Sequence, residues 1–143
     1  MDKIKKFACI LGIAAIISMM AGCRELPLIG KLAGQWQVTE IVYPDGTTVS
    51  APERYYCFYR HTAHLTCYAN IRHTANMTYD YPDLALEFPN VSPCQLTSWG
   101  VFAPPEANDE TRGWIQRYTI DRLTDSQLIM TTAEGTRITL RKY

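Results

Sequence analysis

Three histidines and a cysteine lie close together in the sequence at a spacing that could bind a metal ion. His61, His64 and Cys67 follow one another at intervals of three residues, and His73 comes six residues later. Imidazole and thiolate are common ligands of Zn²⁺. An interval of three places side chains on one face of a helix, whereas on a strand it sends them to opposite faces. Because the surrounding residues are aromatic or β-branched and predict strands, we expect no metal site.

Catalytic motifs are not recognisable in this sequence. It has no Gly-x-Ser-x-Gly, no glycine-rich phosphate loop and no His-Glu-x-x-His. The carboxylates of Glu40, Asp80 and Glu87 are scattered along segments that predict strands, where solvent exposure is their ordinary explanation. We therefore expect a protein that is not an enzyme and needs no cofactor, with a hydrolase or a metal enzyme as the least favoured alternative.

Cys57 and Cys67 could form a disulfide if the two segments that carry them pair as neighbouring strands. The register that places these residues opposite each other centres the connecting turn on Thr62. Opposed residues of neighbouring strands are close enough for a bridge. The turn lacks the Gly, Asn or Asp that tight hairpins prefer, so a bridge and free thiols both stay open. Cys94 would then be a lone thiol.

The residue pattern predicts an all-β framework for these side chains. Apolar residues alternate with polar ones, as in Trp36, Val38 and Val42 against Gln35 and Gln37, and turn-forming residues separate the runs. Strands are expected over residues 34–43, 54–60, 64–71, 77–81, 84–88, 114–121, 127–132 and 136–143. Short connections between successive strands predict a single antiparallel up-and-down meander, and eight strands can close into a barrel without an exposed edge.

Short elements are also expected outside the strands, in two places. One turn of 3₁₀ or α-helix is expected near residues 28–32. The segment 89–112 is interrupted by four prolines and shows no clean period. A structureless connection of that length is uncommon in a compact domain, so we expect a short element at 95–101 or a functional loop.

The charge balance excludes one class of partner. The 143 residues include 14 Lys and Arg and 14 Asp and Glu, without a block of like charge. Nucleic-acid binding requires clustered basic side chains, so no nucleic-acid partner is expected. The length of the chain favours one domain with one core.

Gly34-Gln35-Trp36 at the start of the first expected strand resembles the Gly-x-Trp of the lipocalins, particularly of compact bacterial lipocalin-like lipoproteins. The resemblance covers most of residues 30–143. It implies that Trp36 lies at the closed end of the barrel, under a basic side chain of the last strand. Arg141 is our choice for that side chain, and Lys142, on the other face of the strand, is its competitor. Such a cation–indole contact contributes roughly 0.5 to 2 kcal/mol.

Aromatic residues on the expected strands suggest a binding cavity. Together with Trp36, inward-facing rings of Tyr55, Tyr59, Trp114 and Tyr118 could hold a small apolar ligand inside the barrel, although ordinary core packing is the more common explanation for such rings. Tyr56, Phe58 and Tyr68 would then face outward as exposed rings.

The N-terminal segment has the three parts of an export signal. Three lysines in the first six residues precede an apolar run over 7–20, which is shorter than the roughly 20 residues of a membrane-spanning helix. Met20-Ala21-Gly22-Cys23 then resembles the lipobox of bacterial lipoproteins. We expect residues 1–22 to be a signal peptide, a signal helix that is cleaved off. Cys23 is then the acylated residue, residues 23–33 form a tether and residues 34–143 form the barrel domain.

These features together predict a membrane-anchored protein of the cell envelope that binds a small hydrophobic ligand. Arg24 and Glu25 follow Cys23, and no Asp occupies the retention position, so the outer membrane, facing the periplasm, is the expected location. The alternative is a solid barrel whose outer surface or segment 89–112 binds another envelope protein.

Overall fold

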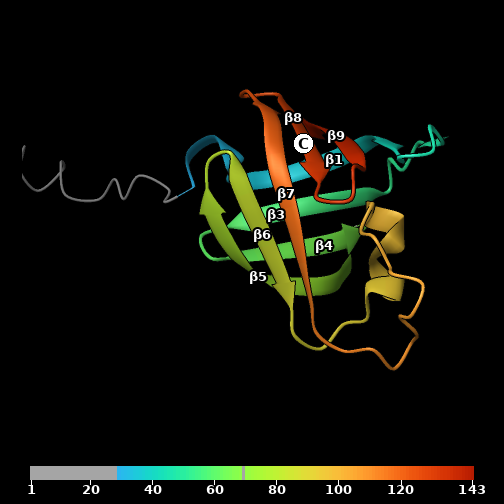
Figure 1. The fold of residues 1–143 in the computed structure, drawn as a ribbon. Coiled ribbons are helices and arrows are strands. Elements are labelled where there is room, and N and C mark those ends of the chain that lie inside the picture. Colours follow the sequence, from blue (N-terminus) through green and yellow to red (C-terminus); the bar gives the residue numbers. More distant parts are fainter. Residues whose placement is uncertain (1–28, 69) are drawn as a thin grey trace, which may run out of the picture.

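The structure, a computed structural model, describes residues 29–68 and 70–143. One antiparallel sheet follows the order of the chain and curls until its first and last barrel strands pair (Figure 1). The strands are β1 (Gly34–Val42), β2 (Thr48–Val49), β3 (Arg54–Tyr59), β4 (Thr62–Cys67), β5 (Asn70–Asp80), β6 (Asp83–Phe88), β7 (Trp114–Leu123), β8 (Gln127–Thr132) and β9 (Arg137–Lys142). The β1–β9 pairing closes eight strands into a barrel, and the short β2 adds to the edge of β1. The predicted eight-stranded antiparallel up-and-down barrel is confirmed.

One long strand differs from the expected pattern. β4 ends at Cys67, and β5 runs through residues that were expected to connect two shorter strands. Arg72, Thr74 and Asn76 are exposed, whereas Ala75 and Met77 are buried, so the alternation of a half-buried strand continues through this polar stretch. The middle of β5 was not predicted as a strand because its outward-facing residues are polar.

A bulge in β1 changes which side chains enter the core. Trp36 and Val38 are fully buried, as the alternation predicts. The pairing with β9 shifts between Val38 and Glu40, so Ile41, and not Val42, is the next inward residue and is 1% exposed. The expectation of an inward Val42 was wrong because a bulge inserts one residue into the alternation.

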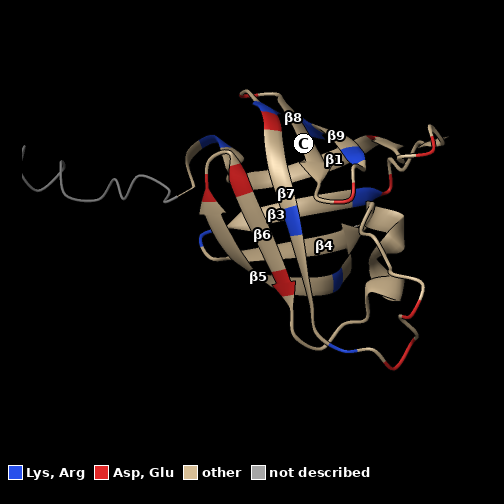
Figure 2. Cartoon of the chain, in the orientation of Figure 1, with Lys and Arg blue, Asp and Glu red and all other residues tan. Residues whose placement is uncertain are grey.

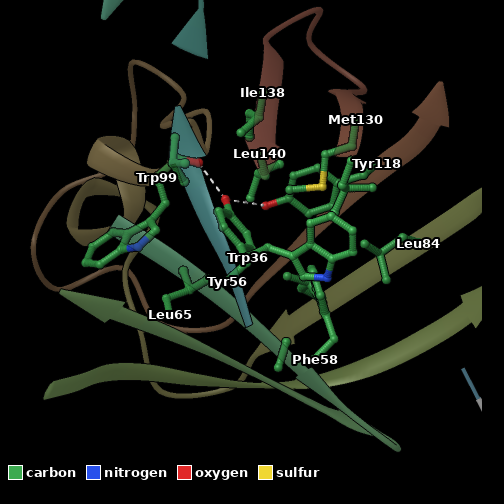
Figure 3. Packing of buried hydrophobic residues seen from close by; sticks show 14 of the residues in the cluster. Trp36, Tyr56, Phe58, Leu65, Leu84, Trp99, Tyr118, Met130, Ile138 and Leu140 are labelled. Carbon is green, nitrogen blue, oxygen red and sulfur yellow. Dashed lines mark hydrogen bonds between the residues drawn. The ribbon is translucent and has the colours of Figure 1, made fainter. Parts of the chain in front are cut away.

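The interior of the barrel is filled by large side chains. Trp36, Tyr56, Phe58, Leu86 and Phe88 are all at most 1% exposed, and Figure 3 shows the first three meeting in the middle of the barrel. The rings of Tyr56 and Phe58 stack with their centroids 6.0 Å apart. Such packing leaves few spaces larger than a water molecule.

Two 3₁₀ helices lie at opposite ends of the barrel (Figure 1). The turn expected near residues 28–32 is η1 (Gly30–Leu32), and the element expected at 95–101 is η2 (Pro93–Trp99). Ser92 begins η2 with a capping box, and Gly100, with φ of 82°, ends it. A Cβ on Gly100 would approach Ile138 Cδ1 to 2.8 Å, so η2 packs directly against the barrel.

Candidate functional site

The closed end of the barrel is built around Trp36. Its Nε1 donates to Leu32 O at 2.9 Å, which joins η1 to the core. Lys142 Nζ lies 4.5 Å from the centre of the Trp36 ring and donates to the carbonyl of Ala33. Burial lowers the pKa of Lys142, and Asp125 acts in the opposite direction. This end of the barrel is therefore sealed by a cation, a ring and backbone carbonyls.

Gly34 is needed where the chain passes Lys142. Its φ is 118°, in a region that L side chains rarely adopt, and a Cβ there would lie 2.8 Å from Lys142 Nζ. The glycine therefore makes room for the cation that covers Trp36.

The choice of Arg141 as the cation over Trp36 was wrong. In the β1–β9 ladder Lys142 pairs with Trp36, whereas Arg141 pairs with Gln37. Residues that pair share a face of the sheet, so Arg141 points outward, where its Nε donates to Gln37 Oε1 at 2.6 Å. The competitor Lys142 occupies the position.

The aromatic side chains of β3 face the opposite way from the prediction. Tyr56 pairs with Trp36 in the β1–β3 ladder and is fully buried, and Phe58 is also inside. Tyr55 and Tyr59 point outward, and Tyr59 is 63% exposed. The two tyrosines therefore cannot line an interior cavity.

Of the other ring predictions, Trp36 and Tyr118 lie in the interior, at most 3% exposed, and pack as core. Trp114 is partly buried against that core. Its Nε1 donates to Gln116 Oε1 at 3.1 Å, and Gln116 Nε2 donates to Glu134 Oε2 at 2.9 Å. Trp114 thus begins a hydrogen-bonded chain that leads to the turn between β8 and β9.

Buried hydrogen bonds fasten η2 over the open end. Tyr56 Oη donates to Trp99 O at 2.5 Å and lies 3.2 Å from Tyr118 Oη, as the dashed lines of Figure 3 show. Burial raises the pKa of both phenols, so both stay protonated. The Tyr118 hydroxyl must then donate to Tyr56, because a phenol has a single proton.

The side chain of Trp99 itself covers the open end of the barrel. The His73 ring meets it edge-on at 5.4 Å, and the Arg54 guanidinium carbon lies 4.5 Å from the centre of the indole ring. Neither Tyr56 nor Trp99 was predicted as a functional residue. The only signal in the sequence was the short element expected within 89–112.

A surface hollow remains beside this closure, and we call it the mouth groove. It holds about 400 Å³ and is lined among others by Tyr43, Pro44, Thr97, Val101, Phe102 and Glu134. Tyr43 Oη donates to Thr97 O at 3.3 Å and so joins the end of β1 to η2. Phe102 is 40% exposed and offers an apolar wall. The groove lies between the β1–β2 turn, the η2 segment and the β8–β9 turn.

Comparison with known proteins agrees with this architecture. A family model described as a lipocalin-like domain matches residues 18–143. The chain belongs to this lipocalin-like family. A lipocalin-like protein from Bacteroides uniformis has a similar structure, with a TM-score of 0.57 and 21% identity over 80% of this chain and 100% of that one. An uncharacterized protein from Bacteroides eggerthii also has a TM-score of 0.57, with 19% identity over 78% of this chain and 99% of that one. No curated protein matches.

The cysteines of this lipocalin-like barrel are free, so the possible Cys57–Cys67 disulfide is contradicted. Cys57 pairs with His64, and Cys67 pairs with Arg54. The register differs by three residues from the one a bridge needs. An odd difference places the two thiols on opposite faces of the sheet.

The histidines do not converge. His64 faces outward and its Nδ1 lies 3.0 Å from Thr74 Oγ1, whereas His73 lies against Trp99 at the mouth. Within residues 29–68 and 70–143 there is no group of three or more His, Cys, Asp or Glu side chains that could hold a metal ion.

The lipidation site Cys23, the signal segment 1–22 and the first part of the tether fall outside the described residues. In the part of the chain that the structure describes, no helix has the length and apolar character needed to cross a membrane.

Proposed function

We propose that this lipocalin-like protein is anchored to a membrane by acyl chains on Cys23 and binds a small, mainly apolar molecule in the mouth groove. The observation that carries the proposal is the groove itself. Its volume of about 400 Å³ lies in the range of roughly 300 to 1,000 Å³ typical of small-molecule sites. We choose the groove over the barrel interior because Trp36, Tyr56 and Phe58 occupy the interior.

The groove combines an apolar wall with an acidic rim. Val101 and Phe102 form the apolar side, whereas Asp45 and Glu134 supply carboxylates. Hydrogen bonds from the backbone and side chain of Thr47 lower the pKa of Asp45, so this carboxylate is ionised at neutral pH. A ligand with an apolar body and a hydrogen-bond donor at one end fits this arrangement best, because an ionised carboxylate only accepts hydrogen bonds.

The proposed anchor would place the groove on the side away from the lipid. Six positions along the sequence separate Cys23 from Ile29, which is buried at the closed end. An extended chain of that length spans about 20 Å. The closed end would thus stay near the bilayer and the mouth would face the periplasm, so ligand would be taken from solution or from a partner. We place the protein in the outer membrane because no Asp follows Cys23.

Probe binding tests the ligand site. Purified protein is titrated with the uncharged fluorescent probe N-phenyl-1-naphthylamine, and we expect saturable binding that Phe102→Ala weakens about tenfold, since burying an aromatic ring contributes about 1.5 to 3 kcal/mol. Ile115→Ala is the matched control, because Ile115 is 50% exposed on the outer face of β7, away from the groove. Absence of saturable binding, or equal losses in the two variants, would refute the site.

The anchor has its own test. Labelling cells with radioactive palmitate should mark the wild-type protein and leave Cys23→Ser unlabelled, and the variant should leave the membrane fraction. A variant that stays labelled and membrane-bound would contradict acylation at Cys23.

A second candidate is a solid barrel that binds another envelope protein. The filled interior favours it, because a barrel without an internal cavity has only its surface for recognition. The probe titration separates the two candidates, since a docking module has no reason to bind an apolar probe at Phe102.

A further inference from the structure

A second hollow lies on the outer wall of the barrel, over β1, β3 and β4, and we call it the wall hollow. It holds about 540 Å³ and is lined by Gln35, Tyr55, Cys57, Thr66, Tyr68 and Tyr143. None of these residues lines the mouth groove. Tyr55, which was expected inside the barrel, therefore lines a site different from the mouth groove.

The floor of the wall hollow contains an unsatisfied hydroxyl. Thr66 is 6% exposed, and its Oγ1 is buried without a hydrogen-bond partner of ordinary geometry among the described residues. Cys57 lies on the neighbouring strand. Burial raises the pKa of its thiol, and the Thr66 hydroxyl acts in the opposite direction. A thiol is a weak hydrogen-bond partner, so Thr66 remains able to bond a ligand that enters the hollow.

Two exposed rings stand at the sides of this floor. Tyr68 and Tyr143 are 71% and 72% exposed, so most of the surface of each ring is open to a ligand. Tyr68 follows the end of β4 toward the mouth, whereas the Tyr143 backbone N–H donates to Gln35 O near the closed end. The hollow therefore has an aromatic ring at each end along the strand direction.

The ring of Tyr55, the third tyrosine of the wall hollow, is held in place by a ring contact and a hydrogen-bond network. Tyr143 meets Tyr55 edge to face, with ring centroids 5.2 Å apart. Tyr55 Oη accepts a hydrogen bond from Gln37 Nε2 at 3.4 Å, and the same Nε2 donates to Pro52 O at 2.7 Å. Arg141 Nε donates to the other end of the Gln37 amide. This side of the hollow is fixed before any ligand arrives, which lowers the entropic cost of binding.

The chemistry of the lining selects the class of ligand. None of the six lining side chains carries a formal charge at neutral pH. Figure 2 agrees, since β4 has no charged residue and β3 has only Arg54 at its start. A charged ligand would therefore find no opposite charge among these six side chains. A wholly apolar ligand would leave the buried Thr66 hydroxyl without a hydrogen-bond partner, as it is among the described residues of the free protein.

A saccharide ring can contact both the tyrosine rings and the uncharged polar groups of this lining. Its C–H faces can lie on the electron-rich faces of tyrosine rings, and its hydroxyls can bond the Thr66 hydroxyl and the Gln35 amide. We propose that the wall hollow binds a neutral saccharide ring, with Tyr68 and Tyr143 as stacking residues and Thr66 as the hydrogen-bonding residue on the floor.

The test is a titration of the ¹⁵N-labelled full chain, followed by NMR, with maltose, cellobiose and chitobiose as probes. At least one of them should shift the amide signals around Cys57 and Thr66 in a saturable way. Tyr68→Ala should weaken binding about fivefold to tenfold, whereas Tyr68→Phe keeps the ring and should bind almost normally. Thr66→Val keeps the shape of the side chain and removes an unpaired hydroxyl, so it should fold and yet bind more weakly.

Tyr59→Ala is the matched control, because Tyr59 is an exposed tyrosine of the same strand face that does not line the hollow. It should leave saccharide binding unchanged. The proposal is overturned if none of the three saccharides binds, if Tyr59→Ala weakens binding as much as Tyr68→Ala, or if the shifts cluster at the mouth groove. Phe102→Ala should not affect saccharide binding, so failure of one site is distinguishable from failure of the other.

Discussion

The hydrogen bonds under Trp99 lead to a quantitative prediction for Tyr56→Phe. The substitution keeps the buried ring and removes the hydroxyl that donates to Trp99 O and accepts from Tyr118. A buried carbonyl left without a donor costs about 1 to 3 kcal/mol, and the Tyr118 hydroxyl also loses its acceptor. We expect Tyr56→Phe to lower the free energy of unfolding by about 2 to 3 kcal/mol.

Tyr118→Phe is the matched variant and should cost less. It removes the hydroxyl that donates to Tyr56 but leaves the bond from Tyr56 to Trp99 intact, so the expected loss is about 0.5 to 1.5 kcal/mol. The double variant should be close to Tyr56→Phe alone, because both hydroxyls belong to one network.

Urea unfolding followed by tryptophan fluorescence and circular dichroism measures these differences. With a slope of about 2 kcal/mol per molar urea, Tyr56→Phe should lower the midpoint by about 1 to 1.5 M. If Tyr118→Phe costs as much as Tyr56→Phe, or if Tyr56→Phe leaves the midpoint within 0.2 M of the wild type, which is about 0.4 kcal/mol at that slope, the fastening of η2 through Tyr56 is refuted.

Two further predictions concern the ends of the barrel. Burial, with Arg72 as the smaller cause, lowers the pKa of His73 in the folded state, so the unfolded chain binds the proton more readily. The contribution of the neutral His73 to the free energy of unfolding should be complete above the ordinary pKa of 6.5 and should decline as the pH falls below it. Urea titrations at several pH values should show that His73→Phe reduces this decline. At the closed end, Lys142→Met should lower the unfolding free energy by about 0.5 to 2 kcal/mol in the same assay, because it removes the cation over Trp36; an unchanged midpoint would contradict that role.

The barrel was predictable because its signals are local. Alternation defined most strands, and turn sequences such as Pro44-Asp45-Gly46 separated them. Closure by eight strands followed from their number and from the short connections between them. The bulge after Val38 has no such local signal, because it is a property of the pairing between β1 and β9.

Which side chains of β3 face the interior could not be predicted, because this depends on the position of the turn between β3 and β4. Tyr59 pairs with Thr62, so Arg60 and His61 form a tight two-residue connection, with Arg60 at a φ of 52°. Two-residue turns of this kind normally contain Gly, Asn or Asp, and this one does not. The misplaced turn moved the register by three residues, which moved Cys57 away from Cys67.

The candidate sites were still harder to predict because they join distant segments. Tyr56 and Trp99 are 43 residues apart in the sequence, and their bond depends on η2 folding back over the mouth. The wall hollow combines residues of β1, β3 and β4 with Tyr143 beyond β9. Neither arrangement leaves a pattern within any single segment.

The pairing of β1 with β9 also constrains how the protein is made. Thr39 bonds Thr139 across 100 positions of the sequence, and Gln37 bonds Arg141 across 104. The ring of strands therefore cannot close until β9 has been synthesised, and such distant contacts make folding slow. Until then β1 and β8 present open edges on which other chains could pair. A truncation that removes only β9 would leave both edges permanently open, so the last strand protects the whole barrel against aggregation.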